Sequence, residues 1–366
     1  MTPTAPSGPP SLRRMIVPAI FVGALFLLVF FRQPAGPQLR DQWILSGTTM
    51  GTAFTVKIVV PIDPGITEDE VAAAVRETVD EVDFRMSTYR ADSELSRFNS
   101  HGTEPFEISP AMLEVMIEAQ RVAEISGGAF DITIGPLVDV WGFGPEPVAD
   151  PPDDATIERL LEEHGYRHLV IEADRLTARK DTAVLRCDLS AIAKGYGVDR
   201  VAQRLMELGF SDFMIEIGGE VLAMGVNAEE HIWRIGVERP QADRAGVWAA
   251  VELADSAMAT SGDYRNYYER DGMRISHTID ARTGRPVTHR LASVTVIHPR
   301  CMTADALATA LSVLGPEEGR ALVEREGLAA LFLIRTADGG FEEWESESWP
   351  GANTRGPEDV APAERY

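Results

Sequence analysis

The sequence predicts an α+β protein whose ordered body spans residues 43–345. Segments that alternate apolar and polar residues, typical of strands, are mixed with segments of helical periodicity, and no regular strand–helix–strand rhythm appears. The 366 residues are 45% hydrophobic and 25% charged, ordinary values for a globular chain. The length exceeds that of a typical single domain, so one large unit or two intimately packed units are expected, and no internal repeat of solenoid length is present.

The N-terminus has the pattern of a membrane anchor. Arg13 and Arg14 precede an uninterrupted apolar run over 15–31, and Arg32 ends it. The run is at the short limit for a spanning helix and also fits the core of a signal peptide. Because no good cleavage site follows, we expect residues 1–32 to be an uncleaved signal anchor, with cleavage as the alternative. Arginines before the run favour a cytoplasmic N-terminus and an extracytoplasmic body.

Two segments flank the body. Residues 33–42 contain two prolines and a glycine and are expected to form a linker. Residues 346–366 are polar and proline-rich, which is typical of a disordered tail.

The first half of the body begins with a strand and three helices. Alternating apolar residues over 54–60 predict a half-buried strand. Thr67 and Glu70 form a capping-box pattern that opens a helix reaching about Met86. Ser109 and the proline after it open a second helix, which the glycine pair 127–128 ends, and a third helix is expected over 154–164.

The second half of the body holds more strands. Helices are expected over 191–208, 303–314 and 317–326. Strands are expected over 168–173, 182–187, 214–222, 233–237, 247–253 and 293–298. The segments 328–334 and 341–344 are expected to form a closing hairpin around Asp338–Gly340.

Charge and composition exclude several functions. Thirty-four basic and 57 acidic residues give a net charge of −23, which argues against nucleic-acid binding and against adhesion to an anionic membrane surface. Two cysteines exclude a disulfide framework. The standard phosphate-loop, zinc-protease and serine-hydrolase motifs are absent from the sequence. If a chain of this charge binds an anionic ligand, the binding site needs a local source of positive charge.

Polar and glycine-rich blocks stand at the expected ends of strands and helices. In order, they cover 47–52 (GTTMGT), 86–99, 127–144, 188–196 (DLSAIAKGY), 216–220 (EIGGE), 259–264 (ATSGDY), 276–284 and 304–309 (ADALAT). One such block is a weak indication, but eight in order are specific. The set resembles the ApbE family, whose members are FAD:protein FMN transferases, over roughly residues 43–335.

The resemblance implies a fold and an activity. The expected fold has two closely joined lobes related to the T-fold, with mixed antiparallel sheets and packed helices. The implied substrate is FAD, the implied cofactor is Mg²⁺, and the implied partner is an acceptor flavoprotein. The implied location is the inner membrane with the catalytic body on the periplasmic side, in agreement with the anchor pattern.

The resemblance makes Asp305, Thr309 and the backbone carbonyl of Ala191 ligands of Mg²⁺. Asp305 and Thr309 stand four residues apart on one expected helix and therefore share a face. Some relatives carry a second carboxylate where this chain has Ala308, so the ligand count stays open. From spacing alone, the alternative is an Asp that accepts from backbone amides beside a packed Thr.

His277 lies in an expected strand, and the resemblance makes it the base that deprotonates the acceptor hydroxyl. Without that resemblance, a structural histidine is the alternative. Asp280 would either orient His277 or satisfy the turn that follows.

The resemblance also places flavin binding on eight residues. They are Met50, Tyr89, Ala129, Phe130, Asp131, Asp188, Lys194 and Ile279. Met50 and Tyr89 offer polarisable or aromatic surface to a planar ring, and Lys194 offers a point charge to a phosphate. Phe130 fits core packing equally well. Gly218–Gly219 permits close backbone approach to a ligand or forms a plain turn.

The leading function is therefore Mg²⁺-dependent transfer of FMN from FAD to a Thr or Ser hydroxyl, with release of AMP. FAD hydrolysis to FMN and AMP is a second reading, and flavin binding without turnover is a third. If Asp188 and Asp305 flank one site, Cys187 and Cys301 come close enough for a disulfide. Two separate buried thiols are the default.

Overall fold

A computed structural model describes residues 39–144, 150–241, 246–262, 267–270 and 273–351. Contacts divide the chain into two units, Met1–Arg40 and Asp41–Tyr366, and the fold below belongs to the second unit. The anchor predicted over 1–32 lies outside the described residues. Within the described ranges, no helix has the length and apolar character required to cross a membrane.

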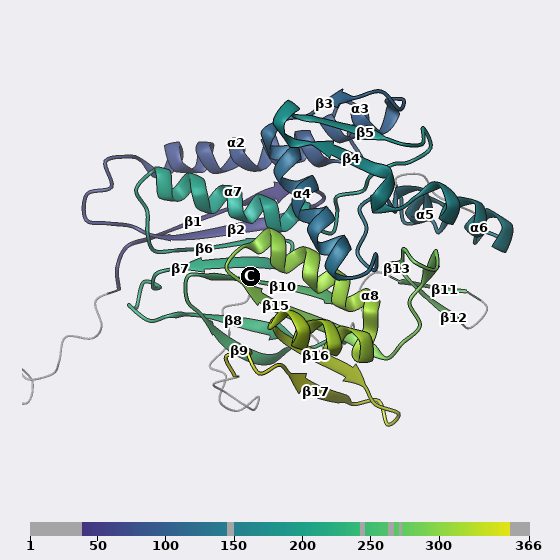
Figure 1. The fold of residues 1–366 in the computed structure, drawn as a ribbon. Helices are drawn as coiled ribbons and strands as arrows, with labels where there is room; N and C mark the ends of the chain where they lie inside the picture. The colour runs from purple at the N-terminus through teal and green to yellow at the C-terminus, as the bar shows by residue number, and fades with distance from the viewer. Residues whose placement is uncertain (1–38, 145–149, 242–245, 263–266, 271–272, 352–366) are drawn as a thin grey trace, which may run out of the picture. The chain divides into compact units, whose positions relative to one another are not determined.

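An eight-stranded sheet, antiparallel at every pairing, runs through the second unit (Figure 1). In spatial order its strands are β1 (Gln42–Thr49), β2 (Thr52–Val59), β6 (Phe213–Ile217), β7 (Glu220–Met224), β10 (Ser256–Gly262), β15 (Leu291–His298), β16 (Ala329–Arg335) and β17 (Phe341–Glu345). Together with the helices below, this sheet confirms the predicted α+β class.

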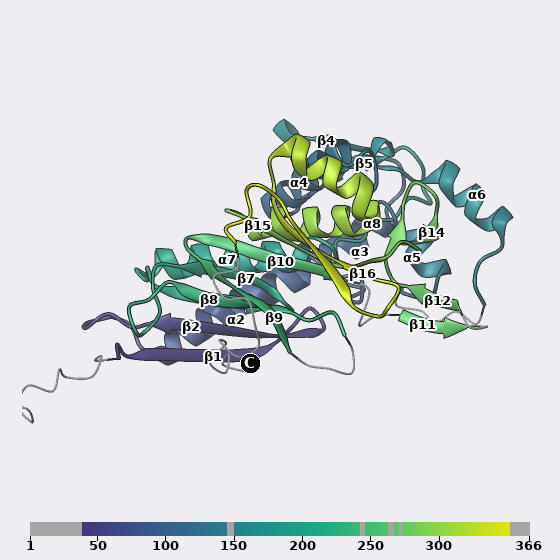
Figure 2. The same cartoon turned by 90° about the horizontal axis from the view of Figure 1, so that it is seen from below.

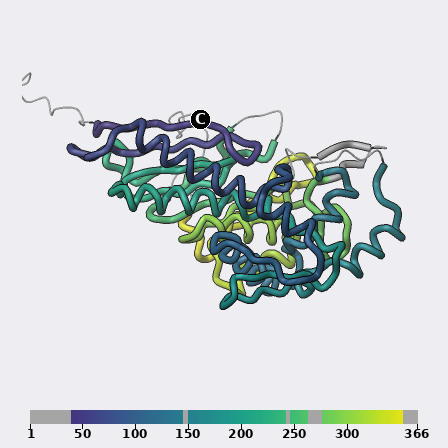
Figure 3. Tube along the Cα trace, turned by 90° about the horizontal axis from the view of Figure 1, so that it is seen from above, coloured from purple at the N-terminus to yellow at the C-terminus, as the bar shows by residue number. Residues whose placement is uncertain are grey.

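Helices cover one face of this sheet (Figures 1 and 3). The described helices of four residues or more are α2 (Glu68–Met86), α3 (Glu94–Ser100), α4 (Pro110–Ile125), α5 (Gly135–Val140), α6 (Asp154–Glu163), α7 (Ala193–Glu207) and α8 (Cys301–Glu326). Valines of α2 and α7, such as Val75 and Val201, pack with Phe54 and Ile215 of the sheet. The predicted capping box is present, because the Thr67 side chain and Glu70 exchange bonds at the start of α2.

A separate hairpin, β8 (Trp233–Glu238) and β9 (Val247–Leu253), covers part of the other face (Figure 2). Because successive side chains of a strand point to opposite faces, Ile58 joins the helix-side core whereas Val59 joins the core beneath β8 and β9. Trp349 is buried in this second core. The first residues of the predicted tail, 346–351, therefore belong to the folded body.

Smaller sheets complete the unit. A three-stranded sheet has the order β3 (Phe106–Glu107), β5 (Thr177–Lys180), β4 (Leu169–Glu172), and two short hairpins pair β11 (Tyr267–Arg270) with β12 (Met273–Ser276) and β13 (Ile279–Asp280) with β14 (Arg285–Pro286). The strand predicted over 182–187 is wrong, because β5 ends at Lys180 and residues 183–184 form a turn. The strand predicted over 214–222 is two strands, because Gly218 and Gly219 adopt positive φ (61° and 102°) and turn the chain.

Candidate active site

The first turns of α7 and α8 contact each other, and each helix supplies an aspartate to the other. Oδ2 of Asp305 on α8 accepts from the Gly195 amide at 3.0 Å, in the first turn of α7. Asp199 on α7 accepts from the amides of Cys301 (2.8 Å) and Met302 (3.0 Å), which begin α8. These are amides that a helix start leaves without an intrahelical partner. A Cβ on Gly195 would lie 2.4 Å from the Cys301 carbonyl oxygen, so the contact requires glycine.

Lys194 stands between two buried carboxylates at this contact. Its Nζ lies 3.6 Å from Oδ1 of Asp305 and 3.4 Å from Oε1 of Glu220. Burial lowers the pKa of Lys194, but the charges of Asp305 and Glu220 outweigh that effect and raise the pKa overall, so Lys194 stays an ammonium. Burial raises the pKa of Glu220, and the charge of Asp305 adds to the rise against the effect of Lys194.

Two hairpin turns bring further residues to the same place. Met50 and Gly51 form the turn between β1 and β2, and Met50 adopts a positive φ of 47°. A Cβ on Gly197 of α7 would lie 3.0 Å from the terminal methyl of Met50. A Cβ on Gly218 would lie 2.8 Å from Thr52 Cγ2 and 3.2 Å from Lys194 Cδ. Gly218 is therefore a turn residue that also allows Lys194 and the β1–β2 hairpin to approach closely.

The oxygen atoms around Asp305 suit a magnesium ion. Thr309 follows Asp305 by one helical turn and is half-buried, as is Ala191 just before α7. Oε2 of Glu220 is buried without a hydrogen-bond partner among the described residues, and Asp305 Oδ1 faces Lys194 at 3.6 Å, longer than a hydrogen bond. Asp305 and Thr309 thus offer a carboxylate and a hydroxyl oxygen from one helix, which are ligand types that Mg²⁺ prefers. The described residues hold no metal-binding group of three or more His, Cys, Asp or Glu side chains, and the predicted set contains only one such residue.

Asp188 lines a polar pocket beside α3 and α5. The pocket is lined by Thr88, Ala91, Ser96, Asn99, Ser100, Gly135, Asp139, Arg186, Cys187 and Asp188. The Asn99 side chain fixes one wall, because it donates to the Cys187 carbonyl and accepts from the Cys187 amide, both at 2.8 Å. Tyr89, next to Thr88, leaves 74% of its surface exposed and is open to a ligand ring.

The segment Ala129–Asp131 is interior. Ala129 and Phe130 are buried, and Phe130 belongs to the core between the helices and the sheet. The Asp131 carboxylate accepts from the amide and hydroxyl of Thr133 (2.8 and 2.7 Å) and from the Tyr166 amide (2.7 Å). These side chains are occupied by packing and hydrogen bonds of the fold itself.

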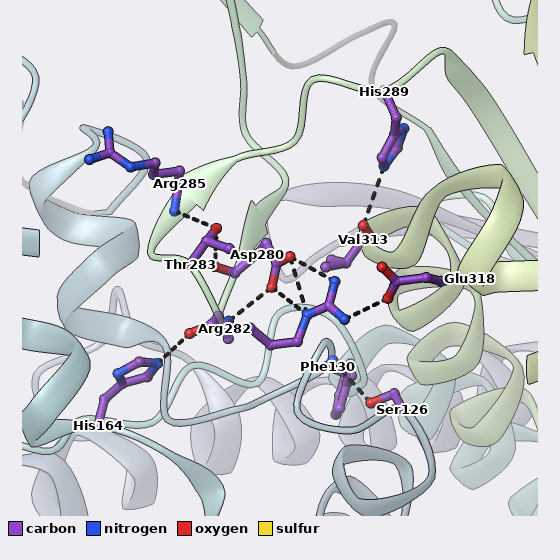
Figure 4. Close-up of polar contacts among 11 residues, drawn as sticks. Ser126, Phe130, His164, Asp280, Arg282, Thr283, Arg285, His289, Val313 and Glu318 are labelled. Carbon is purple, nitrogen blue, oxygen red and sulfur yellow. Dashed lines mark hydrogen bonds and ion pairs between the residues drawn. The ribbon is translucent and has the colours of Figure 1, made fainter. Parts of the chain in front are cut away.

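The segment 277–285 carries the predicted base, His277, and Figure 4 shows Asp280, Arg282, Thr283 and Arg285 of this segment. The half-buried His277 ring packs edge-on against Phe143, with 6.3 Å between ring centroids. Asp280 accepts from the amide of Arg282 (2.9 Å) and pairs with its guanidinium (2.8 Å), which also reaches Glu318 of α8 at 2.6 Å. Of the two roles foreseen for Asp280, the structure shows the one that satisfies the turn. Ile279 lies in an apolar cluster with residues of α5 and α6.

The two cysteines are free thiols, and both are buried. The alternative of a Cys187–Cys301 disulfide is therefore wrong, and the default of separate thiols holds. Cys187 is bound by Asn99 through its backbone, whereas Cys301 begins α8.

Sequence alone missed two acidic residues at the α7–α8 contact, Glu220 and Asp199. Glu220 ends the glycine-rich block 216–220. A carboxylate after a glycine turn, however, gives no local signal of a buried ion pair. Asp199 binds the first amides of α8, a contact that the sequence of its own helix does not reveal.

Comparison with known proteins gives consistent matches. The model of the ApbE family matches residues 50–332. The chain is 45% identical to an FAD:protein FMN transferase of Vibrio cholerae, over 90% of this chain and 97% of the relative, and 42% identical to one of Haemophilus influenzae, over 81% and 87%. Similar solved structures are the flavin transferase ApbE from Vibrio cholerae (TM-score 0.78, 45% identity, 84% and 98% coverage) and Pseudomonas stutzeri flavinyl transferase ApbE in its apo form (TM-score 0.78, 39% identity, 85% and 96% coverage).

Proposed function

The chain belongs to the ApbE family, and we propose that it transfers FMN from FAD to a Thr or Ser hydroxyl of an acceptor protein, releasing AMP. The observation that carries the proposal is the buried group of Lys194, Asp305 and Glu220 at the α7–α8 contact. Burying charged groups costs free energy, and such clusters gather at functional sites. The presence of this one therefore supports a role in binding an anionic substrate.

The reaction makes one bond and breaks one. The acceptor oxygen bonds to the phosphorus of the FMN phosphate, and the bond from that phosphorus to the bridging oxygen breaks, so AMP leaves with that oxygen. The hydroxyl proton passes to a base, the role we assign to His277. Because the phosphorus is surrounded by negative oxygens, positioning and positive charge provide most of the acceleration.

The residues of the site divide this work. Lys194 holds the phosphate side of FAD by its charge, Met50 and the exposed ring of Tyr89 flank the flavin, and Asp188 accepts from hydroxyls of the substrate. Asp305, Thr309 and the carbonyl of Ala191 would hold Mg²⁺, which supplies further positive charge to the phosphate oxygens when bound. In a chain of net charge −23, Lys194 and the bound ion would thus provide the positive charge that an anionic substrate needs.

The test uses the full chain with FAD and Mg²⁺, with an acceptor carrying a modifiable Thr and with the same acceptor after Thr→Val. AMP together with covalent flavin, only with the Thr acceptor, supports transfer. AMP at the same rate with either acceptor, and no covalent flavin, would replace the proposal by FAD hydrolysis. Binding of FAD without AMP, for several acceptors, would leave only a flavin-binding protein. His277→Ala is the matched variant and is expected to bind FAD without turnover.

We also propose that residues 15–31 anchor the protein in the inner membrane with the body on the periplasmic side. The apolar run and the two arginines before it support this placement. Protease added to intact spheroplasts should digest the body. A body that is protected until the membrane is opened would overturn the orientation.

A further inference from the structure

His164 ends α6, and both of its ring nitrogens face backbone carbonyl oxygens. Nδ1 lies 3.0 Å from the oxygen of Leu160, and Nε2 lies 3.0 Å from the oxygen of Ala281. Figure 4 shows the His164 ring directed toward the segment that carries Asp280 and Arg282. The residue is buried, with 8% of its surface exposed. A carbonyl oxygen only accepts, so each nitrogen forms its bond only while it carries a proton. A neutral imidazole carries one proton and would set a lone pair against the other carbonyl.

The surroundings of His164 favour a positive charge. The ring binds a carbonyl of the last turn of α6, where the helix dipole is negative. From the segment before α5, the Asp131 carboxylate interacts with it, and this charge opposes the rise that burial causes in the pKa of Asp131. On α6, the neighbouring Glu163 pairs with Arg159. On the facing segment, Asp280 and Arg282 flank Ala281 and pair with each other.

Ala281 belongs to the segment 277–285, which is fastened on two sides. Toward α5 and α6, Trp141 Nε1 donates to the Gly284 carbonyl at 2.8 Å, and a Cβ on Gly284 would lie 2.7 Å from Ile157. Toward α8, Arg282 pairs with Glu318. The bond from His164 is a buried side-chain bond to the centre of this segment, four residues after His277.

We propose that His164 is a positioning residue that holds the segment 277–285 in place as an imidazolium, and that loss of its proton releases the segment at Ala281. The kinetic consequence rests on the proposed function. Transfer falls at low pH, when His277 is protonated, and falls again at high pH, when His164 loses its proton. The two histidines thus set opposite limbs of the pH profile.

The first experiment reads the charge of His164 directly. The protein contains seven histidines, and ¹⁵N spectra of the histidine-labelled full chain resolve ring nitrogens by protonation state. His164→Gln assigns the signal. At pH 7 we expect both nitrogens of His164 to be protonated, and His231, whose side chain is 73% exposed, provides the reference signal of a solvent-exposed ring. A single-proton tautomer of His164 at pH 7 would overturn the proposal, and this readout does not depend on any flavin transfer.

The second experiment reads the positioning role. His164→Gln keeps one donor group, which reaches only one of the two carbonyls. We expect kcat to fall about tenfold with KM for FAD within about twofold, and the alkaline limb of the profile to disappear. His231→Gln is the matched control and should change neither.

An unchanged alkaline limb in a folded His164→Gln variant, checked by circular dichroism, would overturn the role. If that variant does not fold, His164→Asn is measured in the same way. If the wild-type protein shows no transfer but its His164 is doubly protonated, the proposed function is overturned and the assignment of charge to His164 stands.

Discussion

Asp199 and Asp305 lie on different helices, and each accepts from amides at the start of the other's helix. The exchange fastens α7 to α8 at a point where both helices would otherwise leave amides unsatisfied. The environments of the two carboxylates differ, because only Asp305 also faces Lys194. The pair therefore separates a shared structural role from a catalytic role that we assign to Asp305 alone.

Asp305→Asn is expected to abolish most of the transfer while the fold survives. The amide oxygen of Asn still accepts from Gly195, so the loss in unfolding free energy should be about 1 kcal/mol. The lost negative charge should lower kcat/KM by on the order of 10²-fold or more. Asp199→Asn is the control: it keeps only one of its two accepting oxygens and should lose more stability, but kcat/KM should stay nearly normal. Equal losses of activity in both variants would refute the metal-ligand role of Asp305.

Asp199 should make stability depend on pH. Burial raises the pKa of Asp199 to about 6, against the hydrogen bonds from Met302 and Cys301. Between about pH 4 and pH 6 the folded chain then binds more protons at Asp199 than the unfolded chain does. The unfolding free energy therefore falls as pH rises through this window, by at most about 3 kcal/mol.

Urea unfolding of the wild type and of Asp199→Asn at pH 4 and pH 6.5 measures this effect. The wild type should lose more unfolding free energy over the interval than the variant does. Parallel losses in the two proteins would show that Asp199 has an ordinary pKa in the fold.

Gly218→Ala should weaken FAD binding as well as the fold. The residue has a φ of 61°, and a Cβ would press on Thr52 and on Lys194. Backbone strain should cost about 1–2 kcal/mol of unfolding free energy, and displacement of Lys194 should raise the Kd for FAD about tenfold. Gly327→Ala is the matched control, since its φ is 65° and nothing lies within 4 Å of its Cβ. We expect that control to lose stability only, and equal Kd values for the two variants would count against Lys194 as a phosphate contact.

Both cysteines should behave as protected thiols. They are buried, and burial raises the pKa of each, so little reactive thiolate forms in the folded chain. A thiol reagent should label neither in native protein and both in denaturant. An intact mass two hydrogens lower under non-reducing conditions would reveal a disulfide instead.

Local chemistry explains which elements were predicted. The capping signals at Thr67 and Ser109 act within one turn of their own helices, and the structure has both. The two helices predicted on either side of Gly315 form α8, with Gly315 in a non-helical conformation. β10 escaped prediction because its small and polar residues show no alternation. Its place between β7 and β15 comes from pairing with distant strands.

The same distinction applies to the site. Asp305, Lys194 and His277 were predicted from motifs that resemble a family, and the structure brings the first two within 3.6 Å of each other. Glu220, Asp199 and His164 were missed, because each acquires its partner only from another part of the folded chain. Phe130 shows the converse difficulty: it lies in a motif that suggests flavin binding, but its side chain is buried in the hydrophobic core.

The bond between Gly195 and Asp305 joins residues 110 positions apart in the chain. A chain emerging from the ribosome or a translocation channel has made β1, β2 and α7 long before α8 exists, and bringing such distant segments together is entropically slow. Until α8 arrives, Lys194 lacks one of its two anions, and the start of α7 lacks the carboxylate that binds the Gly195 amide. Competence to bind substrate should therefore appear late and all at once in folding, and no N-terminal fragment that stops short of α8 should acquire it.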